Sequence, residues 1–152
     1  MKKIAIATLL ALAAVSASAV EVGVTATRGD TTGDTRNYAG ITLGQSFGKV
    51  NATAGLERST VGGDQNRWSL VGGYDIAKMG RITVTPKLGV AYLDNQTPSV
   101  QSGYAYTAGI GASIPVTKQV SLTADYAYQR GFDSKVDQFD GNRVTLGAKY
   151  RF

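Results

Sequence analysis

Charged side chains stand at alternate positions inside segments whose other positions are apolar, and they are the first candidates for chemistry in this sequence. Three are acids and six are bases, which allows ion pairs to form among them. Charges enclosed by a fold are costly unless they are paired and hydrated. Two uses follow, either a structural ion-pair network that fills the interior or a narrow polar path for ions and water. The residues are Glu57, Arg67, Asp75, Arg81, Lys87, Asp125, Arg143, Lys149 and Arg151.

A second group of basic residues lies at the ends of three such segments, at positions that alternate in step with the apolar residues. These are Arg28, Arg58 and Arg130. The planar guanidinium fork of arginine matches phosphate, so an outward ring of this kind can bind lipopolysaccharide phosphates. The alternative is that these long side chains only extend toward the interface, without specific recognition. Three further arginines, Arg36, Arg67 and Arg143, lie near the same segment ends but at the alternate positions, which face inward. We expect them to pair with acids of the connecting loops.

Catalysis and cofactor binding find little support in the composition. The sequence has no histidine and no cysteine, which removes Ser–His and Asp–His catalysis, thiolate metal sites and disulfides. No nucleophile–base set is recognisable, so the sequence predicts neither an enzyme nor a cofactor or metal site. Its basic residues are dispersed rather than clustered, which argues against a nucleic-acid partner.

These residues lie on eight segments in which apolar and polar positions alternate, the pattern of β-strands with one apolar face. Only Gln45, Gly72 and Pro86 interrupt the apolar parity. Because a proline inside a strand lacks a ladder donor, we expect a bulge at Pro86. The predicted strands are residues 21–28, 36–47, 49–58, 67–76, 81–93, 103–114, 119–130 and 142–152.

The positions of the aromatic residues decide which face points outward. They fall near the strand ends on the apolar parity, whereas the mid-strand positions are Leu, Val, Ile and Ala. Two aromatic girdles around an aliphatic belt are typical of the lipid-facing surface of a membrane barrel. The sequence therefore predicts an all-β fold, a closed antiparallel eight-stranded transmembrane β-barrel. The girdle residues are Trp68, Tyr92, Tyr104, Tyr106, Tyr126 and Tyr128 beside the longer connections, and Phe47, Tyr74, Tyr150 and Phe152 beside the shorter ones.

The connections between these strands alternate in length. Residues 29–35, 59–66, 94–102 and 131–141 form long polar connections, whereas the others are short. This asymmetry matches outer loops and periplasmic turns, with both ends of the chain on the periplasmic side. Within the last long connection, Phe132 and Phe139 either pack across the barrel mouth or contact a partner.

The two ends of the sequence indicate export and assembly. Residues 1–19 have a basic start, a short apolar run and a small-residue cleavage site, the pattern of a secretory signal peptide, which leaves residues 20–152 as the barrel domain. The segment 144–152 alternates strictly and closes on an aromatic residue. It resembles the insertion signal read by the outer-membrane barrel-assembly machinery, with Thr145, Gly147, Tyr150 and Phe152 as the matching residues.

The strand pattern, the final Tyr150-Arg151-Phe152 and the single-domain size resemble the small eight-stranded outer-membrane barrels, which include opacity-type and Ail/Lom-type proteins. The resemblance implies this fold and a location in the bacterial outer membrane. We further expect a monomer in contact with the membrane lipids and with lipopolysaccharide. Barrels of similar appearance that modify lipid A, or that cleave proteins, need a histidine, which this sequence lacks. Three functions remain open: a structural and surface role at the lipopolysaccharide leaflet, a small passive pore, and an adhesin.

Overall fold

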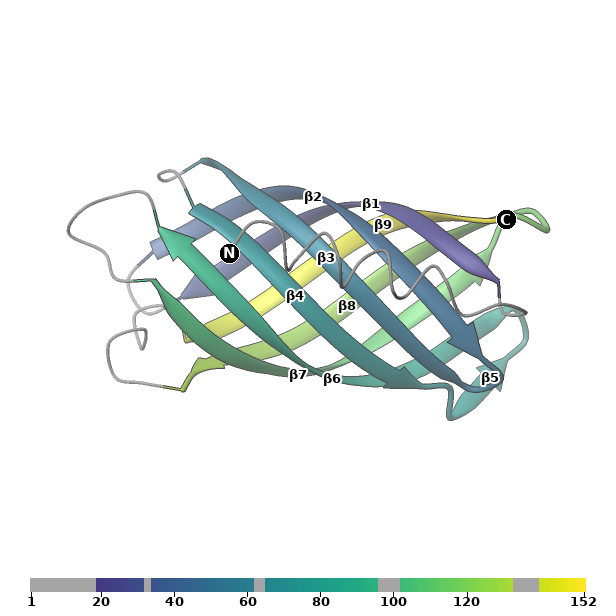
Figure 1. Ribbon diagram of the computed structural model, residues 1–152. Helices are drawn as coiled ribbons and strands as arrows, with labels where there is room; N and C mark the ends of the chain where they lie inside the picture. The colour runs from purple at the N-terminus through teal and green to yellow at the C-terminus, as the bar shows by residue number, and fades with distance from the viewer. Residues whose placement is uncertain (1–18, 32–33, 62–64, 96–101, 133–139) are drawn as a thin grey trace.

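The computed structural model describes residues 19–31, 34–61, 65–95, 102–132 and 140–152. These residues form one antiparallel sheet that closes on itself, because β1 pairs with β9 and β4 pairs with β6 (Figure 1). The predicted closed eight-stranded barrel is confirmed, and a short ninth strand, β5, pairs with the first residues of β6 at one end of the barrel. The strands are β1 (Val20–Thr31), β2 (Asp34–Phe47), β3 (Val50–Val61), β4 (Gln65–Tyr74), β5 (Ala77–Met79), β6 (Ile82–Asn95), β7 (Gly103–Pro115), β8 (Val120–Gly131) and β9 (Gly141–Arg151).

The two faces of the barrel wall have the opposite polarity to those of a water-soluble protein. Large apolar side chains face outward, and those of Leu88, Val24 and Leu146 are 67%, 60% and 60% exposed. The buried set is mainly polar and points into the lumen, as Thr27, Glu57 and Arg67 do. Such an apolar exterior is stable when hydrocarbon surrounds it, and closure of the sheet leaves no backbone edge facing lipid. In the described part of the chain, no helix has the length and apolar character needed to cross a bilayer.

We call the end of the barrel with the β1–β2, β3–β4, β6–β7 and β8–β9 connections the loop end, and the opposite end the turn end. The strands extend further toward the loop end than the sequence predicted. The pairing of β1 with β2 continues to Thr31 and Asp34. Strand β3 ends only at Val61, and strand β4 already begins at Gln65. Residues 29–35 and 59–66 are therefore largely strand, and the predicted long connections there are wrong. The polar Gly, Asp and Thr residues at these positions resemble turn residues in sequence, yet hairpin pairing continues through them.

The expected irregularity at Pro86 coincides with the end of β4. Pro86 keeps its register with Ile110 on β7, whereas on the other side the pairing shifts by one residue between Gly73↔Lys87 and Ala77↔Val84. The extra residue is a bulge, and it separates β4 from β5. The sequence predicted one uninterrupted strand over 67–76 and a turn over 77–80. The structure instead has a β5–β6 hairpin that turns at Gly80, where φ is 62°.

Candidate functional site

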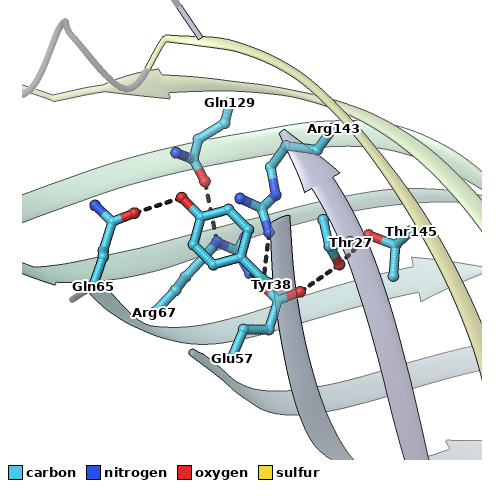
Figure 2. Close-up of polar contacts among 8 residues, drawn as sticks. All are labelled: Thr27, Tyr38, Glu57, Gln65, Arg67, Gln129, Arg143 and Thr145. Atoms are coloured by element: carbon cyan, nitrogen blue, oxygen red, sulfur yellow. Dashed lines mark hydrogen bonds and ion pairs between the residues drawn. The ribbon is translucent and has the colours of Figure 1, made fainter. Parts of the chain in front are cut away.

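Glu57 on β3 is the centre of a polar cluster inside the barrel. Its Oε2 accepts hydrogen bonds from Nη1 of Arg67 on β4 at 2.7 Å and from Nη2 of Arg143 on β9 at 2.8 Å. Oγ1 of Thr27 on β1 donates to Oε1 at 2.5 Å, and Figure 2 shows the three donors converging on the carboxylate. Each of the three charged residues is only 6% exposed. Because a buried charge is costly without a partner, the three residues depend on one another.

A layer of large side chains lies beside this cluster, toward the loop end. The Tyr38 ring lies against the Arg143 guanidinium, 4.8 Å from its Cζ, and the Tyr38 hydroxyl donates to Oε1 of Gln65 at 2.5 Å (Figure 2). Leu93 is 1% exposed, and Oε1 of Gln129 accepts from Nε of Arg67 at 3.1 Å. We call Tyr38, Glu57, Gln65, Arg67, Leu93, Gln129 and Arg143 the plug, since together they fill this part of the lumen.

A second ion pair lies about halfway along the lumen and bridges one strand of its wall, between Lys87 on β6 and Asp125 on β8. The intervening strand β7 has glycines opposite both residues, because Gly109 pairs with Lys87 and Gly111 pairs with Asp125. A Cβ atom at Gly111 would lie 2.9 Å from the Lys87 Nζ and closer still to the Asp125 carboxylate. Glycine at this position therefore leaves the space in which the two charges meet.

The turn end of the lumen holds two further acids. Glu21 accepts hydrogen bonds from Arg151 at 2.5 and 3.0 Å and forms an ion pair with Lys149 at 3.6 Å. Asp75 accepts hydrogen bonds from Nδ2 of Asn51 at 2.9 Å and from Oγ1 of Thr85 at 2.7 Å.

A polar cavity of about 200 Å³ occupies the lumen between these groups. Its walls are mostly Thr, Ser and Gly residues, and its lining runs from Glu57 and Arg143 to Glu21 and Arg151. Tyr38, Gln65 and Leu93 are absent from that lining because they lie beyond the cluster. The cavity therefore ends at the plug and continues toward the turn end, as a blind polar pocket.

Three of the sequence predictions for charged residues differ from the structure. Arg67 and Arg143 pair with Glu57, so the prediction that they pair with loop acids is wrong. Arg81 is exposed in the β5–β6 turn and lies outside the lumen set, because this hairpin continues beyond the end of β4. The remaining members of that set, Asp75, Lys87, Asp125, Lys149 and Arg151, line the lumen.

Sequence reasoning missed several lumen residues. Glu21 shares the inward parity of Gly23 and Thr25, so the alternation of β1 contained the signal. Tyr38 and Leu93 were missed because we assumed that all large apolar side chains of a strand lie on its outward face, whereas these two point inward. Gln65 lies in a segment that was interpreted as a loop.

The outward arginines of the loop end form what we call the arginine rim: Arg28 on β1, Arg58 on β3 and Arg130 on β8. All three are exposed. Arg28 lies 3.4 Å from the Asp30 carboxylate, and Arg130 lies 3.8 Å from that of Asp140. Arg130 pairs in register with Tyr106, a residue of the predicted upper girdle.

The residues assigned to the aromatic girdles have their side chains on the outer wall of the barrel, and some of them have neighbouring rings. The rings of Tyr92 and Tyr104 are 4.9 Å apart between centroids. Phe132 is 64% exposed, with its ring centroid 5.7 Å from that of Tyr106 on the outer wall, so the expected packing across the mouth is not found for it. Phe139 lies outside the described residues.

The residues of the predicted assembly signal lie on both faces of β9. Thr145 faces inward and shares a 2.8 Å hydrogen bond with Thr27. Tyr150 and Phe152 lie outside with ring centroids 4.9 Å apart, and the Phe152 amide donates to the Val20 carbonyl at 3.1 Å. The predicted signal peptide lies outside the described residues, except for Ala19.

Solved structures share this fold at low sequence identity. The N-terminal β-barrel domain of Pseudomonas aeruginosa OprF matches with a TM-score of 0.73 and 17% identity, covering 88% of this chain and 97% of its own. Yersinia pestis Ail in a phospholipid nanodisc matches with a TM-score of 0.59 and 14% identity, covering 90% and 100%. The outer membrane enzyme PagL matches with a TM-score of 0.60 and 18% identity, covering 84% and 98%.

The expected resemblance to small outer-membrane barrels is thereby confirmed, and such likeness shows the fold. No curated protein matches the sequence. A family model described as Gram-negative porin matches residues 7–152. This match and the outer-membrane barrels of the same fold place the protein in the bacterial outer membrane. The chain belongs to the Gram-negative porin family.

Proposed function

We propose that this protein is a non-enzymatic barrel whose arginine rim binds the phosphate groups of lipopolysaccharide in the outer leaflet. The supporting observation is that Arg28, Arg58 and Arg130 are exposed and outward at the loop end of three strands. Longer outer loops mark the leaflet that holds lipopolysaccharide, and a guanidinium binds phosphate through two parallel hydrogen bonds.

The carboxylates beside the arginine rim bind its guanidinium groups only weakly, so a stronger anion can replace them. The side chains of Arg28 and Asp30 are 66% and 60% exposed, and an exposed pair of this kind contributes about 0–1 kcal/mol. Arg130 is 61% exposed beside Asp140 at 3.8 Å. A lipid phosphate at the edge of the hydrocarbon layer is held in a less polar medium, so it can displace either carboxylate.

The interior supports a structural role over catalysis. Its charged groups are engaged with one another, as in Glu57 with Arg67 and Arg143, or with neutral donors, as in Asp75 with Asn51 and Thr85. Histidine is absent from the sequence. PagL shares the fold and is an enzyme, but that likeness concerns the fold alone. We therefore propose no reaction for this chain.

The test is a triple variant with Arg28, Arg58 and Arg130 all changed to Ala, assayed for binding of purified lipopolysaccharide by the folded, detergent-solubilised barrel. We expect at least a tenfold loss of affinity, equivalent to about 1.4 kcal/mol. The matched control changes Lys49, Lys78 and Lys118, three exposed lysines of the turn end, to Ala and removes the same charge. If the rim variant and the unmodified protein bound lipopolysaccharide with equal affinity, the arginines would be side chains at the membrane interface that recognise no specific ligand.

A passive pore is the second candidate, because the polar cavity of about 200 Å³ supplies part of a water path. The plug interrupts that path at the loop end. An eight-stranded barrel is only wide enough for side chains to fill its interior, so the geometry favours the closed barrel.

A further inference from the structure

Besides Arg151, which pairs with Glu21, four described cationic side chains are exposed at the turn end of the barrel, opposite the arginine rim. Lys49 lies between β2 and β3, Lys78 on β5, Arg81 in the β5–β6 turn, and Lys118 between β7 and β8. Within the described residues, none of the four has an ion pair. We call them the turn-end cations.

The acids near this end are already engaged inside the lumen. Glu21 is held by Lys149 and Arg151, and Asp75 by Asn51 and Thr85. By contrast, the sequence concentrates its other acids in and beside the loop-end connections, apart from Glu57 and Asp125 in the lumen. Among the described residues, these loop-end acids are Asp30, Asp34, Asp94 and Asp140. Acids and exposed arginines are therefore mixed at the loop end, whereas the exposed charged side chains described at the turn end are all basic.

Exposed apolar side chains lie among the turn-end cations. Ile76 is 59% exposed, Met79 63% and Val116 56%, and all three are in or beside the turns rather than on the regular wall. In water, such side chains would be unfavourable beside so much charge. At the boundary of a bilayer both kinds are satisfied, since the apolar groups enter the acyl region and the cations reach the headgroups.

We propose that the turn-end cations bind anionic phospholipid headgroups in the periplasmic leaflet and hold a local excess of that lipid around the barrel. Short turns of such barrels face the periplasm, which places these side chains at that leaflet. Each Lys or Arg near a membrane surface contributes attraction for anionic lipid, and the four act together. This inference concerns the end of the barrel opposite the proposed lipopolysaccharide site, so it stands or falls separately.

Strand β4 offers a reporter for each end. Trp68, the single tryptophan of the sequence, is outward near the loop end, whereas Tyr74 is outward at the turn end and pairs with Val50, next to Lys49. The turn-end reporter is therefore the double variant Trp68→Phe with Tyr74→Trp. Its fluorescence is measured in phosphatidylcholine vesicles that contain equal fractions of either brominated phosphatidylglycerol or brominated phosphatidylcholine.

We expect the brominated anionic lipid to quench the turn-end reporter roughly twofold more than the brominated zwitterionic lipid. Changing Lys49, Lys78 and Lys118 to Ala in that background removes the excess, and raising the salt concentration lowers it without any mutation, because exposed charges are screened. Changing the three rim arginines to Ala leaves it in place. A gel of boiled and unboiled samples verifies folding of each variant.

Equal quenching by the two lipids with all four cations present would overturn the proposal, and so would an excess that persists in high salt. If the unmodified barrel instead bound isolated peptidoglycan through these lysines, with no lipid preference, the turn end would belong to a cell-wall contact. Failure of the lipopolysaccharide experiment would leave this result unchanged, since the two assays differ and the two sets of residues lie at opposite ends of the barrel.

Discussion

At the scale of single residues, the plug depends on one carboxylate that serves two guanidinium groups. We predict that Glu57→Gln lowers the free energy of unfolding by about 3–5 kcal/mol, because it leaves Arg67 and Arg143 buried and unpaired. The measurement is urea unfolding of the barrel in detergent micelles, followed by tryptophan fluorescence.

Asp75→Asn provides the matched control for this substitution. Asp75 is also an inward acid, but neutral Asn51 and Thr85 donate to it, so its loss is expected to cost only about 1 kcal/mol. Similar losses for the two variants would mean that the ion pairs contribute little beyond ordinary hydrogen bonds. Restored stability on adding Arg143→Met to Glu57→Gln would support the argument further.

The sequence predicted that these charges face inward but not which of them meet. Parity assigns a residue to a face, whereas its partner depends on strand register and on which strands face each other across the lumen. Glu57 and Arg67 are register partners on adjacent strands, but Arg143 comes from β9, 86 residues along the chain. That contact requires the closed barrel, so no local pattern indicates it.

At the scale of elements, β9 both completes the wall and bears the predicted assembly signal. We predict that deleting Phe152 lowers the amount of protein in the outer membrane severalfold while the purified chain still refolds in detergent. The ring contacts Tyr150 on the outer surface and is 76% exposed, so its loss removes little packing. Membrane levels are compared by immunoblot, beside refolding yield on a gel of unboiled samples.

Phe47→Ala is the control for that deletion, since Phe47 is another outward aromatic at the turn end, 44% exposed. It is expected to assemble at ordinary levels. Ordinary membrane levels of the chain without Phe152 would contradict the interpretation of 144–152 as a signal, and poor refolding in detergent would assign the effect to stability instead.

The sequence was sufficient to predict which segments form strands, but not the residues at which those strands begin and end. All eight barrel strands follow from alternation, because each needs one face for lipid and one for the lumen. Strand β5 was missed, although Pro86 indicated where the irregularity would fall. A proline marks a missing donor but does not specify on which neighbouring strand the extra residue is inserted.

At the scale of the whole molecule, the plug and the blind cavity predict electrical behaviour. We expect refolded protein in planar bilayers to show no reproducible channel steps, because Tyr38, Leu93 and Gln129 are each less than 5% exposed and close the lumen. A gel of boiled and unboiled samples confirms that the inserted protein is folded. Steps that change with Lys87→Ala or Asp125→Ala would show a conducting lumen and favour the pore.

The polarity of the exterior made the whole fold predictable. Aromatic residues at the strand ends and aliphatic residues between them specify a lipid-facing wall, and an even number of strands closes it. The loop lengths were overestimated at residues 29–35 and 59–66, since polar strand ends in water have the same composition as turns.

The seam between β1 and β9 also sets the order in which the molecule can be made. Glu21 and Arg151 meet across it although 130 residues separate them, so neither edge is covered until the last strand arrives. In hydrocarbon, each uncovered edge would keep a row of amides and carbonyls without partners. Synthesis proceeds from the other end, and nothing formed earlier can substitute for β9. We therefore expect insertion to have no stable halfway stage, so that a chain truncated before residue 141 does not persist in the membrane.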